Sequence, residues 1–421
     1  MKFCLNDFCS FFTESSAVFY AVSALLLAYG GAVIAMTLAL FVRTARPKEN
    51  SAVDTEDKPA AADAPGVSVV IPFRNEERNL GALLESIDGQ NYGGMIEVIL
   101  VNDGSTDGGA DVIKKFVPSN KKLCINVIDL QTSINTDTKL TSKQQALDLG
   151  VDSSSHSLIL FTDADMILEP AWAGSMVNSR LSTNADMVFG HTAIMRKGIG
   201  IDKSVNTDIN TNVNTDKRGL IRKLFVLFES YQLEYLFSFA RAFSKLNLTG
   251  SCMGNNILIT KEAYAACGGQ RGIGYSIVED RALLGLVRKK GFKTAAQEPF
   301  TVTAWTYPSR SSAQFANQTL RWARGGLRPG GGLFAAGALL LTQNILFLLS
   351  IMCVLPPIPT LQCAANFILT WAFLSISFHK NGAPVSKILF PAHYLFMMAE
   401  TAVFLPLTLF WRKIEWKDRK V

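Results

Sequence analysis

The stretch LILFTDADMIL, residues 158–168, places two aspartates one residue apart inside an otherwise apolar segment. The run LILFT has the length and composition of a buried strand, so Asp163 and Asp165 would lie just beyond its end. Each carboxylate is costly there unless another group compensates its charge. The remainder of the chain has to supply that group.

Upstream of this stretch, short apolar runs alternate with segments of helical spacing. The runs are VSVVIP at 67–72, MIEVILV at 95–101 and CINVIDL at 124–130. The segments between the runs, at 80–87, 107–117 and 142–149, are predicted helices. This alternation predicts an α/β domain built on a mostly parallel sheet.

Polar residues follow three of the predicted strands, and ligands of such sheets bind beyond the carboxyl ends of the strands. Two carboxylates spaced Asp-x-Asp can face one hard cation that also holds substrate phosphates. A solvated turn is the alternative for this pair, and turn or helix-cap chemistry is the alternative for NDGSTDG at 102–108. The residues at the three ends are Pro72, Arg74, Asn75, Glu76, Asp103, Asp163 and Asp165.

Taken in order along the chain, these motifs resemble an inverting family 2 glycosyltransferase of the GT-A fold over residues 67–325. The motifs that carry the resemblance are VSVVIPFRNEE, VILVNDGSTD, SKQQALDLG, LFTDADMILEP, TGSCMGNNILITKEAYAACGG, VEDRALLGLVRKKG and QTLRW. The resemblance implies a GT-A domain that binds a nucleotide-sugar, with a UDP-sugar as the expected donor.

The resemblance also implies a role for each residue at the donor site. Asp103 would contact the nucleoside, with the loop Pro72–Glu76 beside it. Asp163 would face the donor, and Asp165 would hold Mg²⁺ or Mn²⁺ against the diphosphate. A cation in that place would stabilise the charge on the leaving group. The implied donor-binding residues are Pro72, Arg74, Asn75, Glu76, Asp103, Lys143, Asp163 and Arg321.

Glu279 and Asp280 open the segment EDRALLGLVRKKG, whose acidic start and basic end also suit an ordinary helix dipole. The resemblance assigns Asp280 as the general base that takes the proton of the acceptor hydroxyl, with Glu279 in support. A single attack from the opposite face would invert the configuration of the sugar.

Gln318, Arg321 and Trp322 form Gln-x-x-Arg-Trp within about one helical turn. An interfacial amphipathic helix is the alternative reading, and the two readings are compatible. The resemblance implies that Arg321 meets the diphosphate while Gln318 and Trp322 face the acceptor. The small residue Gly254 would let the backbone approach the acceptor.

The ends of the chain predict membrane helices, because 48% of the 421 residues are hydrophobic and the excess lies at the ends. Residues 17–42 carry no charge and precede RTARPK, which indicates a retained anchor and a cytoplasmic domain. A cleaved signal is the alternative. The predicted organisation is an anchor at 1–43, a linker at 44–66, the catalytic domain at 67–325 and a C-terminal membrane region at 326–421.

The C-terminal candidates are 333–355, 361–378 and 388–411. Three crossings would leave the basic tail outside, against the preference of basic residues for the cytoplasm. The segment 388–411 is the weakest span because it contains two prolines, His393 and Glu400, and a re-entrant or interfacial course is the alternative for it. Two or three spans are therefore expected in an integral, multi-pass protein of the plasma or inner membrane.

Other features exclude several chemistries. The seven cysteines and four histidines lack the spacing of a zinc site or a catalytic triad. The net charge of +6 is concentrated at membrane flanks, which favours anionic lipid over nucleic acid as a partner. Two departures from the family pattern are Asp148, where asparagine is usual, and residues 202–217, a low-complexity insertion predicted to be a disordered loop.

Three other functions remain as alternatives. A nucleotidyltransferase would open with a glycine-rich phosphate loop in place of PFRNEE. A non-catalytic membrane scaffold or lipid flippase would not need Asp280 together with the Arg-Trp motif. A processive polysaccharide synthase would need enough helices to enclose a polar chain, whereas the few predicted spans favour transfer of one or few sugars to a lipid or glycan acceptor.

Overall fold

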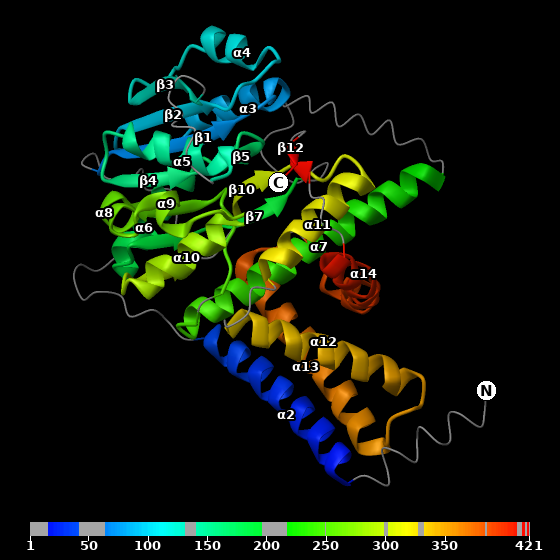
Figure 1. The fold of residues 1–421 in the computed structure, drawn as a ribbon. Coiled ribbons are helices and arrows are strands. Elements are labelled where there is room, and N and C mark those ends of the chain that lie inside the picture. The colour runs from blue at the N-terminus through cyan, green and yellow to red at the C-terminus, as the bar shows by residue number, and fades with distance from the viewer. Residues whose placement is uncertain are drawn as a thin grey trace.

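The computed structural model describes residues 16–41, 64–130, 140–195, 217–248, 250–298, 302–326, 332–383, 385–410, 415–416 and 419–420. An α/β unit forms one end of the molecule, and apolar helices project from the other (Figure 1). The linker 44–63 and the insertion 202–216 lie outside the described residues, whereas Lys217 begins a helix.

The α/β unit is built on a seven-stranded sheet with the order β3-β2-β1-β4-β8-β6-β9. Neighbours β1–β2, β2–β3, β1–β4 and β6–β9 are parallel, while β8 runs antiparallel to β4 and β6. The sheet is therefore mostly parallel, which confirms the predicted fold class. Its strands are β1 (Val67–Phe73), β2 (Ile96–Asn102), β3 (Leu123–Asp129), β4 (Leu158–Phe161), β6 (Met187–Phe189), β8 (Ile257–Thr260) and β9 (Thr294–Ala296).

Helices cover both faces of this sheet. Strand β1 is buried along its whole length, as expected of a central parallel strand, with Val69 and Ile71 facing one core and Val70 facing the other. The first core contains side chains of α3 (Glu77–Asp88), α4 (Gly109–Lys115) and α6 (Trp172–Thr183). The second core contains side chains of α5 (Ser142–Asp152), α8 (Lys261–Ala266) and α10 (Glu279–Lys289), with α9 (Gly269–Ile273) beside them.

A smaller sheet with the order β5-β10-β7 lies beside the large one (Figure 1). Strand β10 (Val302–Thr306) runs antiparallel to β5 (Met166–Leu168) and parallel to β7 (His191–Ile194). Because β5 begins directly after Asp165, this pairing holds the Asp-x-Asp loop against the end of β10. A short pair, β11 (Glu415–Trp416) and β12 (Arg419–Lys420), completes the described strands.

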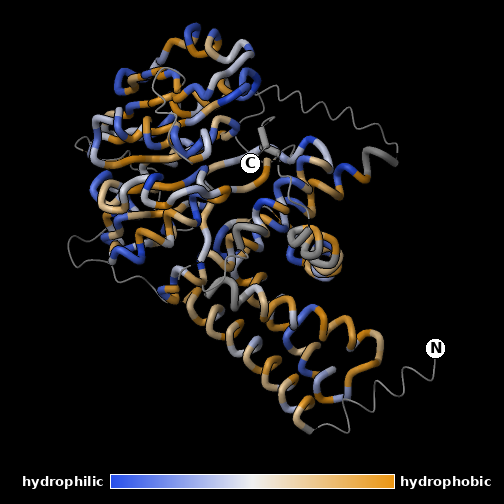
Figure 2. Tube along the Cα trace, viewed as in Figure 1, coloured by the Kyte–Doolittle hydropathy of each residue, from blue (hydrophilic) through white to orange (hydrophobic). Residues whose placement is uncertain are grey.

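Three apolar helices pack side by side: α2 (Ser16–Ala39), α12 (Gly332–Ile351) and α13 (Pro357–Asn381). Most residues along these three helices are hydrophobic (Figure 2). Two of these helices, over Ala17–Ala39 and Pro357–Asn381, are long and apolar enough to cross a membrane, and Gly337–Ile351 is a shorter apolar helix. The two long helices coincide with the predicted anchor and with the candidate 361–378, whereas the candidate 333–355 is matched only by the shorter helix.

The third candidate forms α14 (Phe390–Phe410), preceded by the 3₁₀ turn η2 (Lys387–Leu389). In Figure 1, α14 is seen nearly end-on, whereas α2, α12 and α13 lie in the plane of the picture. It packs against two long helices that run beside each other, α7 (Lys217–Lys245) and α11 (Ser312–Gly326).

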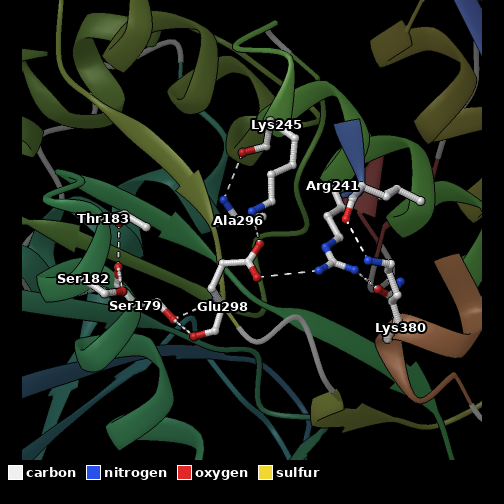
Figure 3. Close-up of polar contacts among 11 residues, drawn as sticks. Ser179, Ser182, Thr183, Arg241, Lys245, Ala296, Glu298 and Lys380 are labelled. Atoms are coloured by element: carbon white, nitrogen blue, oxygen red, sulfur yellow. Dashed lines mark hydrogen bonds and ion pairs between the residues drawn. The ribbon is translucent and has the colours of Figure 1, made fainter. Parts of the chain in front are cut away.

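Charged groups join the α/β unit to the apolar helices (Figure 3). Glu298, which follows β9, pairs with Lys245 of α7 at 2.7 Å and with Arg241 of α7 at 3.6 Å. The buried Arg241 guanidinium also donates to the Asn381 side chain at the end of α13. Because the Arg241 fork is planar, one side chain orients three segments at this junction.

Candidate active site

The first part of the site is formed where β1 and β2 end. The guanidinium of Arg74 donates to the backbone oxygen of Asp103 at 2.8 Å. Asn75 has a φ of 53°, and its side chain accepts from the Thr106 amide at 2.8 Å. These bonds lock the loop after β1 to the NDGSTDG loop, with Asp103 buried between them. The structure therefore brings Arg74, Asn75 and Asp103 together, as predicted.

Pro72 is the last residue of the predicted run VSVVIP and the second-last residue of β1, which extends one residue further, to Phe73. A proline in a central strand lacks an amide for the ladder. Here the amide is not needed, because β4 pairs only with residues 67–70 of β1. Glu76 is the N-cap residue of α3, and its carboxylate accepts a hydrogen bond from the Asn79 side chain in the first turn of that helix.

Lys143 is the group that compensates the first aspartate of LILFTDADMIL. It lies in the first turn of α5, and its ammonium is 3.0 Å from Asp163 and 2.9 Å from Glu279. Burial disfavours the ammonium, but the two carboxylates outweigh burial and raise the pKa of Lys143. Lys143 therefore stays charged and ties the end of β4 to the start of α10.

Asp280 lies one residue beyond Glu279, in the first turn of α10. Its carboxylate accepts from the Gly254 and Arg281 amides, each at 2.7 Å. Burial, followed by the negative charge of Glu279, raises the pKa of Asp280 to about 6. A carboxylate with such a pKa can take a proton near neutral pH, which is the property a general base requires.

Gly254 faces Asp280 directly. A Cβ at position 254 would lie 3.3 Å from the Asp280 Cβ, which is tighter than most real contacts. The glycine therefore lets the backbone approach the carboxylate and donate to it. Gly254 is predicted to lie beside the acceptor, and it contacts Asp280, the residue predicted to take the proton of the acceptor hydroxyl.

Asp165 lies next to Tyr307, which follows the last residue of β10. The pairing of Met166 with Thr306 sets the two residues opposite each other across the antiparallel strands. Burial and the negative charge of Asp165 raise the pKa of Tyr307, while the nearby Arg310 opposes the shift. Tyr307 carries no motif signal, so sequence reasoning missed it.

The strand order sets the distance between the two halves of the site. Strands β2 and β4 lie on either side of β1, so the loops with Asp103 and Asp163 are separated by two strand spacings, roughly 9–10 Å. An extended nucleotide can bridge such a gap, with its base at one loop and its phosphates at the other.

The Gln-x-x-Arg-Trp residues lie in α11, and all three are partly buried. The Trp322 ring packs against the core formed by α5, α8 and α10. Within the residues described, no hydrogen bond or ion pair engages the Arg321 guanidinium. This cation is therefore available for an anionic ligand.

Asp148, the departure from the family pattern, has a structural role. Its carboxylate accepts from the Tyr264 hydroxyl at 2.7 Å and from the Gln270 amide at 2.8 Å. A Cβ at Gly269, whose φ is +59°, would lie 2.5 Å from the same carboxylate. Burial raises the pKa of Asp148 despite these bonds. The side chain therefore fastens α5 to the turn between α8 and α9.

The donor atoms present suit a hard divalent cation. Within the described ranges, no three His, Cys, Asp or Glu side chains cluster as a complete metal site. Asp163 and Asp165 offer carboxylate oxygens, and Mg²⁺ and Mn²⁺ commonly complete their shells with water and substrate phosphates. Two carboxylates alone do not fill the coordination shell of such a cation, so they suit a cation whose remaining ligands are water and the phosphates of a nucleotide.

Two family models match the chain. The model of Glycosyl transferase family 2 matches residues 68–268, and that of Glycosyl transferase family 21 matches residues 199–421. The first match contains the strand-end residues and Lys143, whereas the second contains Glu279, Asp280 and the Gln-x-x-Arg-Trp helix.

Curated relatives are similar over shorter regions. A dodecaprenyl-phosphate galacturonate synthase of Rhizobium johnstonii is 28% identical over 139 residues, which are 32% of this chain and 39% of that protein. A 4,4'-diaponeurosporenoate glycosyltransferase of Staphylococcus aureus is 36% identical over 100 residues, 24% of each chain. The matches thus span well under half of the length of these relatives.

Among solved structures, a mannosyltransferase from Pyrobaculum calidifontis in complex with GDP-Man and Mn²⁺ aligns with 92% of this chain and 99% of its own. The sequence identity is 14% and the TM-score is 0.49.

Proposed function

The chain belongs to glycosyl transferase family 21, and from this premise we propose that it transfers a sugar from a nucleotide-sugar to a hydroxyl group of a lipid acceptor, with inversion. The family assignment makes the protein a glycosyltransferase and removes the non-catalytic scaffold, the flippase and the nucleotidyltransferase. The observation that carries the proposal is the chain of contacts Asp163–Lys143–Glu279, with the raised pKa of Asp280 beside it.

The donor occupies the edge formed by β1, β2 and β4 in this proposal. Asp103 binds the nucleoside, Asp163 faces the sugar diphosphate, and Arg321 pairs with its phosphates. A divalent cation held by Asp163 and Asp165 would stabilise the negative charge that builds on the leaving diphosphate. A UDP-sugar is the expected donor.

Asp280 is the proposed general base. Its carboxylate takes the proton from the acceptor hydroxyl as the oxygen attacks the anomeric carbon from the face opposite the diphosphate. Two backbone amides hold the carboxylate in place, and each oxygen retains a lone pair for the incoming proton. General-base help of this kind contributes typically ~10²–10⁴ in rate.

The lipid acceptor is supported by position and by chemistry. Helix α11 adjoins both the active-site core, through Trp322, and α14 among the apolar helices. The names of the two curated relatives specify a polyprenyl phosphate and a carotenoid acid, both of which are hydrophobic molecules. An acceptor that stays in the bilayer needs only an entrance beside α11, whereas an extruded polymer needs an enclosed path.

The proposed topology has α2, α12 and α13 crossing the membrane and the α/β unit in the cytoplasm. Helix α14 starts beside the middle of α13, where the ring centroids of Phe390 and Phe367 are 5.0 Å apart. Further along α14, Glu400 accepts hydrogen bonds from α7 and α11. A re-entrant course for residues 385–410 leaves the basic tail on the cytoplasmic side, as the positive-inside rule favours.

A donor screen tests the proposal. The purified full chain would be incubated in lipid vesicles with Mn²⁺, extracted lipids and a panel of UDP-, GDP- and dTDP-sugars, while nucleotide release is followed. Release that depends on one donor and on added lipid supports the proposal. Absence of release with every donor would contradict it.

A further inference from the structure

Three helices meet at one carboxylate away from the strand-end site. Glu400 is the only acidic residue of α14, and both of its oxygens accept from the Gln232 amide of α7, at 2.7 and 2.9 Å. The hydroxyl of Thr319 in α11 donates to the same carboxylate at 3.3 Å. One side chain of an otherwise apolar helix therefore holds both long helices that lie beside the α/β unit.

An aromatic layer lies one helical turn away. Phe396 of α14 stacks on Phe228 of α7 with ring centroids 5.0 Å apart, and its centroid is 6.3 Å from that of Phe315 in α11. Phe315 also contacts Phe225, at 4.9 Å. On every helix the aromatic residue precedes the polar residue by four positions, so the two layers share one face of each helix.

The two layers set the rotation of α11. Phe315 and Thr319, both nearly buried, form the face of α11 that points toward α14 and α7. Arg321 lies two positions after Thr319, about 200° around the helix, and therefore projects from the opposite side. A helix held at Phe315 alone could still turn about its axis, whereas the hydrogen bond at Thr319 fixes the angle at which Arg321 leaves the helix.

A carboxylate at this place is not explained by helix packing alone. Glu400 is partly buried, and an acid shielded from water in an apolar helix costs free energy that an apolar residue of similar volume would avoid. The cost is offset by three hydrogen bonds, and two of these come from an amide that spans both oxygens. Such a site specifies one arrangement of helices, because the carboxylate loses its partners in any other.

We propose that Glu400 is a positioning residue: by holding Thr319 and Gln232, it fixes the rotation of α11 and thereby aims Arg321 at the diphosphate of the donor. This inference rests on the proposed role of Arg321 in donor binding. Glu400 touches neither the donor nor the acceptor, and it acts only through the helix that carries Gln-x-x-Arg-Trp.

The test compares nucleotide binding by the full chain and its variants in detergent. UDP, GDP and dTDP, each with Mn²⁺, serve as probes for calorimetry, and melting temperature is measured on the same samples. Glu400→Ala should weaken nucleotide binding about tenfold and raise the donor KM more than it lowers kcat. Glu400→Gln keeps an acceptor oxygen for Gln232 or Thr319 and should recover most of the affinity.

Two further variants separate positioning from general stability. Tyr394→Phe removes a 2.8 Å hydrogen bond between α14 and Asn344 of α12 without touching α11, so it should lower the melting temperature but leave nucleotide affinity unchanged. Thr319→Val should weaken nucleotide binding, whereas Thr319→Ser should not. The comparison of Thr319→Val with Thr319→Ser keeps the inference testable if Glu400→Ala fails to fold.

The outcomes also separate this inference from the proposed function. If the native chain binds UDP, GDP or dTDP, and Glu400→Ala and Thr319→Val bind the same nucleotide equally well, Glu400 is only a structural residue and the inference is wrong. If the native chain binds none of the three nucleotides, the proposed function is wrong and the inference fails with it.

Discussion

The ammonium of Lys143 lies 2.9 Å from the carboxylate of Glu279, a residue 136 positions later in the chain. The same ammonium contacts Asp163 at 3.0 Å, so one cation stands between the donor end of the site and the start of the helix that carries the proposed base. The two acids would repel each other without it.

Removal of this cation is therefore expected to disrupt the site as a unit. Lys143→Met leaves two partly buried carboxylates without their shared cation, so the end of β4 and the start of α10 should shift apart and kcat/KM should fall by about a hundredfold. Lys143→Arg keeps the charge and should retain part of the activity. Initial rates over donor concentrations below and above KM would give kcat/KM for both variants, and a near-native value for Lys143→Met would refute the electrostatic role.

The pH dependence follows from Asp280. Because the base must be ionised, transfer should fall as the pH drops through the pKa of about 6. Stability should respond in the opposite sense. The folded-state pKa lies above the unfolded value, so the contribution of Asp280 to stability is fully present below the unfolded pKa of 3.8 and is lost as the pH rises through about 6.

Asp280→Asn should bind donor normally and lose transfer by ~10²–10⁴. Single-turnover rates and nucleotide affinity, measured on the same preparation from about pH 5 to 8, roughly one unit below to two units above the pKa of Asp280, would check both expectations. Transfer by the asparagine variant at the native rate would place the base elsewhere.

Metal removal should abolish turnover. Asp165 is proposed to hold the cation that stabilises the leaving diphosphate, so both EDTA and Asp165→Ala are expected to eliminate nucleotide release. Added Mn²⁺ should restore the native chain after EDTA treatment but not the variant. Circular dichroism of the variant controls for folding, and full activity in EDTA would exclude a metal-dependent reaction.

Asp148→Asn serves as a contrasting variant in α5, the helix that also carries Lys143. The asparagine side chain keeps one oxygen that can accept from Tyr264 or Gln270, and burial no longer opposes a charge. We expect kcat/KM to stay within about threefold and the melting temperature to change by only a few degrees. A loss comparable to that of Asp280→Asn would show that Asp148 takes part in the reaction.

Much of the fold could be predicted because its signals are local. The strands β1 to β4 are β-branched or apolar runs, and the structure places all four within a few residues of the predicted limits. The smaller sheet was not predicted, because β5, β7 and β10 have only three to five residues and their pairing depends on segments more than a hundred residues apart.

In the site too, some residues have local sequence signals and others depend on contacts between distant segments. Asp103 and Asp163 follow strands, so their positions make them candidates, whereas Asp280 is assigned by the resemblance of its segment to the family motif. The contacts of Lys143 with both Asp163 and Glu279 join three elements, and no spacing in the sequence encodes them. Glu400 is a case in which the sequence identifies the residue but not its role. It is an unusual acid in an apolar segment, but only the packing of α7, α11 and α14 shows what it binds.

The central claim is the transfer of a sugar to a lipid, and the measurement that tests it most directly is mass spectrometry of the reaction product. The full chain in vesicles would be incubated with Mn²⁺, the donor selected by the screen and extracted lipids, and the lipid fraction would be compared with that from Asp280→Asn. The account predicts a lipid whose mass increases by one or a few sugar residues with the native chain only. A ladder of long, lipid-free polysaccharide would contradict it and would identify a processive synthase.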